Sequence, residues 1–151
     1  MPLDYIVSSL PALRFGESAP ITMERFAEIA GGPVGPSAKW RDLETQLRNA
    51  VAEARGGGER WRRPADGCSL YWRNRVLACF QEKDVARREE MLDKTWWDAA
   101  GELVPAANPL GRGALEAYAV RLAIAVRRTG ISQEAGAAAF DRMTSATKEA
   151  I

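Results

Sequence analysis

The strongest constraint on the fold is the spacing of apolar side chains in the stretch before the first run of glycines. These side chains recur at i, i+3 and i+4: Trp40, Leu43, Leu47, Ala50, Val51 and Ala54. That spacing places them on one face of an α-helix. The opposite face is polar: Arg41, Asp42, Thr45, Gln46 and Glu53. We therefore expect an amphipathic helix that Ser37 caps and that Gly56–Gly58 ends.

The same periodicity predicts further helices, separated by stretches rich in Gly and Pro. Thr22 is expected to cap a short helix that ends at Gly31, and other helices are expected over about 70–81, 85–103 and 114–128. The second and third of these four could form one long helix, because no strong breaker separates them. Thr129-Gly130 is expected to stop the fourth. Ser132 then caps a last helix with the apolar residues Ala135, Ala139, Phe140 and Met143.

These elements predict an all-α protein with a single compact domain of five to six helices over residues 1–151. Loops are expected near 31–37, 56–69 and 104–113. The segment Tyr5–Leu10 fits either a short N-terminal strand or a helix, and Pro11 would end both. A chain of 151 residues suits one domain, and 46% hydrophobic with 27% charged residues is typical of a globular protein.

Composition excludes several kinds of chemistry. The chain has no histidine, which rules out catalytic triads with a His base, His metal ligands and His-based pH switches. Cys68 and Cys79 match no redox or zinc spacing, so we expect two reduced thiols, with Cys79 in the core. No metal and no cofactor are expected.

The sequence also shows no targeting signal. Met1–Asp4 lacks a basic n-region, and no apolar run approaches the roughly 18 residues that a membrane helix needs. We expect a cytoplasmic protein without direct membrane insertion. The formal net charge of +1 gives no global attraction to nucleic acid.

The stretch from Arg55 to Arg75, here called the basic segment, is the first candidate functional site. It combines arginines with interleaved aromatic residues: Arg55, Arg60, Trp61, Arg62, Arg63, Tyr71, Trp72, Arg73 and Arg75. Such a mixture suits an acidic protein surface or single-stranded nucleic acid. A solvated loop with Trp72 turned into the core is the third interpretation.

Charged residues close to the apolar stripes form a second candidate. Glu44 and Arg48 are four residues apart and can pair on one helix. Arg121 interrupts an apolar stripe and would need a carboxylate, for which Glu44, Glu89 and Glu116 are candidates. We expect a structural ion-pair network. A catalytic pair of carboxylates is the alternative, but nothing in the sequence brings a specific pair together.

The adjacent residues Trp96 and Trp97 form a third candidate. Neighbours on a helix point about 100° apart, so one can be buried while the other lies at the edge of the stripe. Trp97 is therefore either ordinary packing or an exposed anchor for a partner protein.

Four motifs resemble a family of bacterial proteins encoded in V-type (archaeal-type) ATPase operons. The motifs are Tyr5-Ile6-Val7-Ser8-Ser9-Leu10-Pro11-Ala12-Leu13, Trp40-x-x-Leu43-Glu44-x-x-Leu47-Arg48-Asn49, Glu89 through Leu92-Asp93 to Trp96-Trp97, and Tyr118-Ala119-x-Arg121-Leu122 with Gly136 and Phe140 beyond. The opening with Leu10-Pro11 is the most specific of them.

The resemblance implies a non-catalytic helical adaptor or assembly subunit, by analogy with the stalk subunit called C (d in eukaryotes). Its partners would be stalk or catalytic subunits of a V-type ATPase, which would hold it peripherally at the membrane. Under this hypothesis Arg60, Arg62, Arg63 and Trp97 contact an acidic partner. The alternative function is a nucleic-acid-binding helical module that uses the basic segment.

Overall fold

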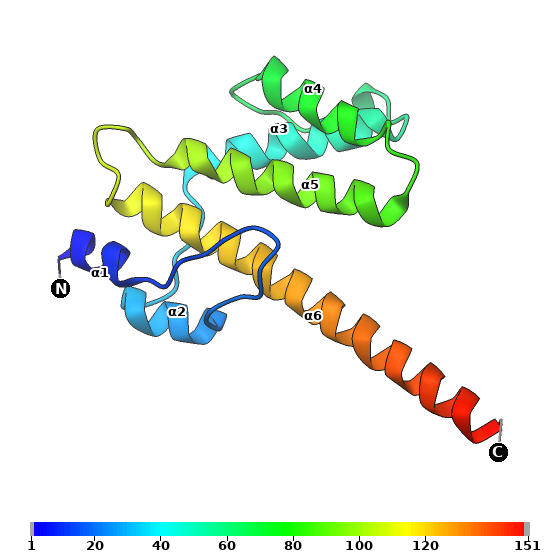
Figure 1. Cartoon of the computed structure of the whole chain (residues 1–151). Coiled ribbons are helices and arrows are strands. Elements are labelled where there is room, and N and C mark those ends of the chain that lie inside the picture. Colours follow the sequence, from blue (N-terminus) through cyan, green and yellow to red (C-terminus); the bar gives the residue numbers. More distant parts are fainter. Residues whose placement is uncertain (1, 150–151) are drawn as a thin grey trace.

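Helices make up the whole of the regular structure in the part of the chain that the computed structural model describes, residues 2–149 without the side chains at 133, 135, 139 and 147–149. Six α-helices and no strand are present in that range (Figure 1). They are α1 (Leu3–Ser9), α2 (Met23–Ala30), α3 (Ala38–Ala54), α4 (Leu70–Cys79), α5 (Val85–Ala100) and α6 (Arg112–Glu149), with the short 3-10 helices η1 (Glu59–Trp61) and η2 (Gly101–Leu103). The all-α prediction is confirmed. A strand over Tyr5–Leu10 is wrong, because α1 occupies this segment.

The helices begin where short polar side chains cap them. Thr22 Oγ1 accepts a hydrogen bond from Arg25 N at 3.0 Å, and Ser37 Oγ accepts one from Trp40 N at 3.2 Å. Asp84 caps α5 in the same way, through Ala86 N at 3.0 Å. Residues 70–103 are not one long helix, because α4 ends at Cys79 and Asp84, in an extended conformation, caps a new helix.

The helices form layers on the two sides of α6. In Figure 1, α3, α4 and α5 lie together on one side of the first half of α6, and α1 and α2 lie on the other. The main core joins α3, α4 and α5 through the buried residues Trp40, Leu47, Trp72, Val76 and Leu92. A second core joins α2 to α6 through Phe26, Leu115 and Leu122. The first half of α6 is therefore covered from both sides.

The turn into α6 depends on a close approach that only glycine allows. A Cβ at Gly113 would lie 1.9 Å from the Leu103 carbonyl oxygen and 3.0 Å from its carbon. Those are backbone atoms of η2, which cannot move aside as a flexible side chain could. Glycine at this position lets α6 begin directly against the end of α5 and η2.

The prediction that Thr129-Gly130 stops a helix, and that Ser132 starts another, is wrong. The helix α6 runs without interruption through both positions. Thr129 stays helical because its Oγ1 donates to the Ala125 carbonyl at 2.8 Å and accepts from Ala19 N at 3.1 Å. Glycine costs about 1 kcal/mol relative to alanine inside a helix, which weakens a helix without ending it.

Beyond Gly130, α6 extends away from the other helices (Figure 1). We call residues 131–149 the projecting half of α6. All the side chains described between 131 and 146 are exposed, with Phe140 at 69% and Met143 at 70%. The side chains of Ala135 and Ala139, which the sequence placed on the same apolar face, lie outside the described residues.

Both cysteines are free thiols, as predicted: Cys79 is buried in the main core and Cys68 is exposed. Across the described helices, none is both long enough and apolar enough to cross a membrane.

Candidate protein-interaction surface

A row of polar side chains on α3 holds the loop part of the basic segment in place. The row follows one line along the helix, at i, i+4, i+7 and i+11: Asp42, Gln46, Asn49 and Glu53. Each of the four bonds to the chain between Arg63 and Arg73. The sequence predicted that three of these residues face solvent. Their helical spacing was visible, but the loop that would cover them was not.

The side chain of Asn49 holds the loop by hydrogen bonds to the loop's main chain. Its Nδ2 donates to the Arg63 carbonyl at 2.8 Å, and its Oδ1 accepts from Arg63 N at 2.8 Å. The amide side chain thus satisfies both backbone groups of one residue, as a neighbouring strand would. Gln46 adds a third bond to the main chain, because its Oε1 accepts from Ser69 N at 2.8 Å.

Asp42 holds the turn at the end of the loop. Its carboxylate accepts hydrogen bonds from Asp66 N, from Gln46 Nε2 at 2.8 Å and from Gly67 N at 3.1 Å. These bonds stabilise the charged form, so the pKa of Asp42 lies below its ordinary value, chiefly through the bond from Asp66. A Cβ at Gly67 would lie 2.6 Å from Gln46 Nε2, so glycine gives the loop its close approach to α3.

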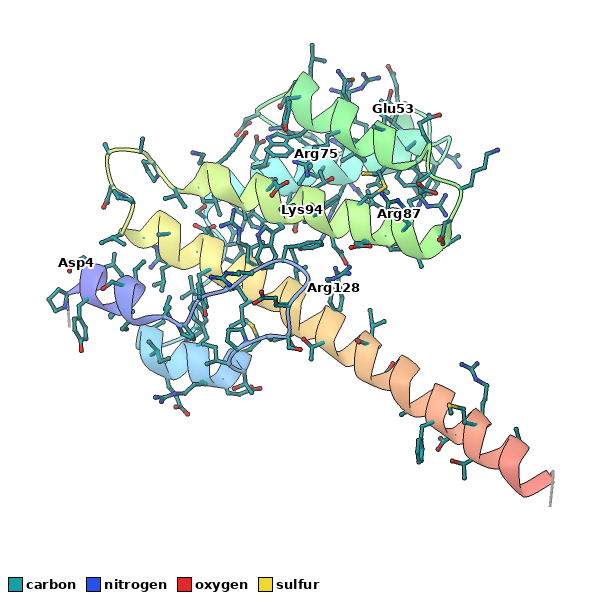
Figure 2. All side chains as sticks on the ribbon, in the orientation of Figure 1. Asp4, Glu53, Arg75, Arg87, Lys94 and Arg128 are labelled. Carbon is teal, nitrogen blue, oxygen red and sulfur yellow. The ribbon has the colours of Figure 1, made fainter. Side chains whose placement is uncertain are left out.

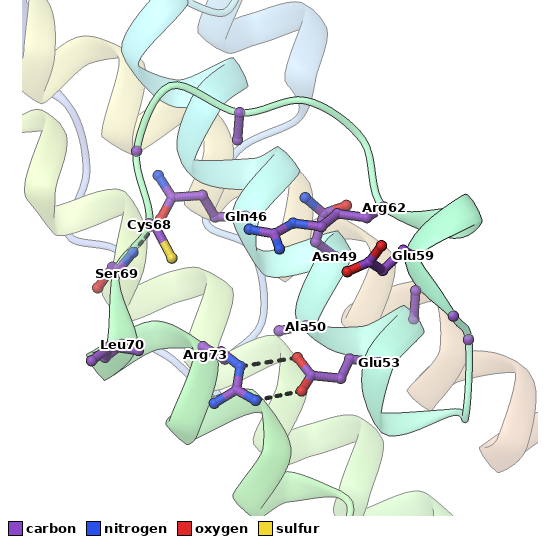
Figure 3. Close-up of a pocket in the computed structure, with 15 residues that line it drawn as sticks. Gln46, Asn49, Ala50, Glu53, Glu59, Arg62, Cys68, Ser69, Leu70 and Arg73 are labelled. Carbon is purple, nitrogen blue, oxygen red and sulfur yellow. Dashed lines mark hydrogen bonds and ion pairs between the residues drawn. The ribbon is translucent and has the colours of Figure 1, made fainter.

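The last residue of the row connects α3 to α4. Glu53 receives two hydrogen bonds from the Arg73 guanidinium, one of them Nε to Oε2 at 3.0 Å (Figure 3). This hydrogen bonding lowers the pKa of Glu53, and the charge of Arg62 lowers it further. The same pairing raises the pKa of Arg73.

Between the row and the loop lies an open pocket of about 460 Å³. In Figure 3 its labelled lining includes Arg62, Arg73, Glu53, Glu59 and Cys68. Its volume falls in the range of small-molecule sites, about 300–1,000 Å³, but its lining charges largely compensate one another. Among the side chains that the structure describes, no three carboxylates or thiols gather closely enough to hold a metal ion.

The arginines of the loop are exposed and form no ion pair with the described carboxylates, and Arg62 acts on Glu53 only through its charge. Arg60, Arg62 and Arg63 are all exposed, and no carboxylate of the described chain forms an ion pair with any of them. Arg60 lies over the ring of Trp61 at 5.0 Å, and Trp61 is itself 57% exposed. The loop therefore presents three guanidinium groups and an aromatic ring, next to the stretch from Arg63 to Ser69 that α3 holds.

The aromatic residues at the start of α4 behave differently from one another. Trp72 is buried, and its Nε1 donates to Glu102 at 2.6 Å. Tyr71 is 63% exposed and meets Trp72 edge to face at 4.7 Å between ring centroids. Trp72 therefore belongs to the core, as one interpretation of the sequence held, and Tyr71 extends the exposed surface.

The prediction that Trp97 contacts a partner is wrong. Trp97 is only 6% exposed, and its ring packs edge to face against Phe15 at 5.5 Å. The reason is that α5 is covered on more than one side. α6 and the loop before α2 enclose Trp97, together with Ile124 and Ala125, in a third cluster. The apolar stripe of a helix indicates which face packs against one neighbouring element. It does not show whether a second element buries another side of the same helix.

The predicted charged cluster forms only at its first pair. Arg48 Nη2 and Glu44 Oε1 are 3.2 Å apart, on the surface of α3. Glu89 is exposed on α5. Glu116 is buried at 5% exposure, but its Oε1 accepts from Ser37 N at 2.7 Å and from Ser37 Oγ at 2.8 Å instead of meeting an arginine. It thus supports the start of α3, where a negative charge interacts favourably with the helix dipole.

Arg121 also finds partners other than the predicted carboxylates. Its Nε donates to the Trp97 carbonyl at 2.9 Å, and its guanidinium lies 5.6 Å from the centre of the Trp97 ring. Burial lowers the pKa of Arg121, while the charge of Asp98 partly opposes this effect. The carbonyl and the ring face stabilise the cation in place of an ion pair.

Two further groups of ion pairs centre on Asp98 and Asp93, which the sequence analysis did not assign to any ion pair. Asp98 pairs with Arg75 at 2.5 Å and with Lys94 at 3.1 Å, two residues that Figure 2 places on the α4–α5 face. Burial pushes the pKa of Asp98 up, but the bonds from both cations outweigh it, so the net pKa is lowered. Asp93 pairs with Arg127 and Arg128 and joins α5 to α6. Only tertiary contact brings these groups together.

Comparison of the chain with models of protein families, with curated proteins and with solved structures finds no match.

Proposed function

We propose that this chain is a non-catalytic helical adaptor that binds an acidic surface of a partner protein through the loop of the basic segment. The observation that carries the proposal is the set of three exposed arginines that form no ion pair in the described chain, on a loop whose main chain α3 holds from Arg63 to Ser69. A fixed loop loses little conformational entropy on binding, which favours recognition.

The available charge is concentrated in the loop and not spread over the whole basic segment. Arg73 and Arg75 are engaged with Glu53 and Asp98. The guanidinium of Arg55 lies over the ring of Phe80 at 5.8 Å. Arg60, Arg62 and Arg63 are the cluster that can pair with carboxylates of a partner, and Trp61 beside Arg60 can supply apolar contact. Arg55 is also exposed without an ion pair to the described carboxylates, but it lies apart from them at the end of α3.

The partner that the sequence resemblance suggests is a V-type ATPase, through its stalk or catalytic subunits. Under this proposal the protein works in the cytoplasm and reaches the membrane only through the ATPase. The all-helical body suits such a role, although the resemblance alone supplies the identity of the partner.

The test is affinity capture of the tagged full-length chain from its native cell extract, read by mass spectrometry. The variant R60E/R62E/R63E reverses the three charges of the loop. The matched control R25E/R41E/R112E reverses three exposed arginines on α2, α3 and α6. We expect the wild type and the control to recover ATPase subunits and the loop variant to lose them, with unchanged circular dichroism. Failure of the wild type to recover ATPase subunits would overturn the partner, and equal recovery by both variants would overturn the surface.

Nucleic-acid binding is the second candidate, because Trp61 is exposed beside Arg60 and Tyr71 is exposed at the start of α4. Stacking of bases on these rings would give affinity for single strands without sequence preference. Fluorescence anisotropy with a labelled single-stranded oligonucleotide should then show binding at low salt that falls steeply as salt increases. No binding at low salt would exclude this candidate.

A further inference from the structure

The projecting half of α6 continues an apolar seam that is buried in the first half of the same helix. The seam recurs every seven residues: Leu115, Leu122, Thr129, Gly136 and Met143. Leu115 and Leu122 are buried against α2. Phe140 follows Leu122 by about five full turns at 3.6 residues per turn, so it lies on the same line of the helix. Phe140 and Met143 therefore extend the buried face into solvent.

The cover of this seam ends at a defined point. The loop before α2 reaches α6 at Thr129, where Ala19 N donates to Thr129 Oγ1. Past this contact, Figure 1 shows no other helix or loop beside the projecting half. Most of the stability of helices in proteins comes from packing of an apolar face, so an uncovered apolar seam here is suited to pairing with another helix.

The shape of the seam is complementary to itself. A Cβ at Gly136 would meet nothing within 4 Å, which leaves open space one turn away from the large ring of Phe140. In an antiparallel pair with a two-fold axis level with Ala138, Phe140 of each copy lies over Gly136 of the other. The two Phe140–Gly136 contacts form together, because a two-fold interface uses the same surface patch of each copy.

The surroundings of the seam favour the antiparallel arrangement over the parallel one. In a parallel pair the two α1–α2 layers would collide, because they cover the same face of α6 that carries Phe140. An antiparallel pair places the two bodies at opposite ends. The charges from 131 to 149 also nearly balance, with Glu134, Asp141 and Glu149 against Arg142 and Lys148, so the two helices do not repel each other strongly.

We propose that two copies of this chain pair through the projecting halves of α6, antiparallel, with Phe140 of each copy packed over Gly136 of the other. The small residue Ala137 lies beside the seam and allows close approach of the helices. This pairing is independent of the loop arginines and gives the adaptor two copies of its basic surface.

Sedimentation equilibrium of the full-length chain tests the pairing. We expect a dimer for the wild type. F140E should raise the dissociation constant by at least about a hundredfold, since it would bury a charge at the contact. G136L should weaken the dimer as well, because it fills the space that Phe140 needs. The matched control A138E, on the opposite face of the helix, should remain dimeric. A wild type that is monomeric at every concentration, or F140E as dimeric as A138E, would overturn the proposal.

Orientation is tested with a spin label at A146C in a C68S background, which removes the exposed native thiol. In the antiparallel pair the two labelled positions are separated along the axis by about 24 Å, at 1.5 Å per residue. In a parallel pair they would be neighbours at about the 8–10 Å spacing of packed helices. The longer distance supports the proposed pair, and the shorter one overturns it.

Discussion

The two halves of α6 share one sequence pattern and differ in everything that surrounds them. From Arg112 to Thr129 the helix is enclosed by α2 on one side and α5 on the other, and Leu122 is fully buried. From Ile131 onward the same seven-residue seam is exposed. The comparison shows that periodicity determines which face of a helix is apolar, whereas long-range contacts determine whether that face is covered within the chain.

The largest expected effect comes from truncating one apolar side chain in each half of α6 and comparing the two losses of stability. Leu122→Ala should lower the free energy of unfolding by about 2–5 kcal/mol, because it leaves a cavity at a fully buried site. Phe140→Ala should change it by less than about 0.5 kcal/mol in the monomer, because the side chain is exposed. Urea denaturation at low protein concentration measures both. Similar losses for the two variants would break the comparison.

A second prediction concerns how the covered half of α6 supports α3. Glu116→Ala should cost about 1.5–3 kcal/mol of unfolding free energy, because it removes a charged acceptor from Ser37 N and Ser37 Oγ. The control Glu44→Ala breaks an exposed ion pair with Arg48 and should cost about 0–1 kcal/mol. Thermal and urea denaturation give the two values, and a control as costly as Glu116→Ala would argue against a special role for the buried carboxylate.

The third prediction tests whether α3 fixes the loop that carries the exposed arginines. Asn49→Ala should cost about 1 kcal/mol overall, since it removes two bonds to the main chain of Arg63. Hydrogen exchange of the Arg63 amide should become at least about tenfold faster. Thr45→Ala, on the same helix but bonded only to the Arg41 carbonyl, is the control and should leave that amide unchanged. An unchanged Arg63 amide in Asn49→Ala would mean that other contacts order the loop.

The smallest effect compares two glycines of α6. Gly136→Ala should stabilise the monomer by about 0.4–1 kcal/mol, because the added Cβ meets nothing and the unfolded chain loses freedom. Gly113→Ala should destabilise it, because its Cβ would collide with the Leu103 carbonyl. Melting temperatures at low concentration distinguish the signs. A destabilising Gly136→Ala in the monomer would show that the projecting half packs against the body.

Local signals were sufficient to predict the helical class and several helix ends. Thr22, Ser37 and Gly31 occupy the cap positions that their side chains or backbone freedom suggested. The Thr129-Gly130 signal failed because Thr129 found two partners in the folded protein, one of them Ala19 from far along the chain. A local breaker is outweighed when tertiary contacts satisfy its side chain.

The exposed charges of the candidate site could be predicted from the sequence. The contacts with α3 that hold the loop could not. Arg60, Arg62 and Arg63 stand out in the sequence because basic residues cluster there. The row on α3 that holds them was hidden, since its polar residues resemble any solvated helix face. The prediction that Trp97 contacts a partner failed for a related reason. Its side of α5 is covered by α6 and by the loop that contains Phe15, and the sequence of α5 alone does not show either.

The most direct test of the adaptor proposal is the salt dependence of the affinity between the purified chain and the partner protein that affinity capture recovers. We predict that the wild type binds tightly at low ionic strength and loses affinity as salt screens the exposed arginines. R60E/R62E/R63E should bind weakly at both ionic strengths, and R25E/R41E/R112E should follow the wild type. A wild-type affinity that is unaffected by salt and by the three reversals in the loop would contradict the account.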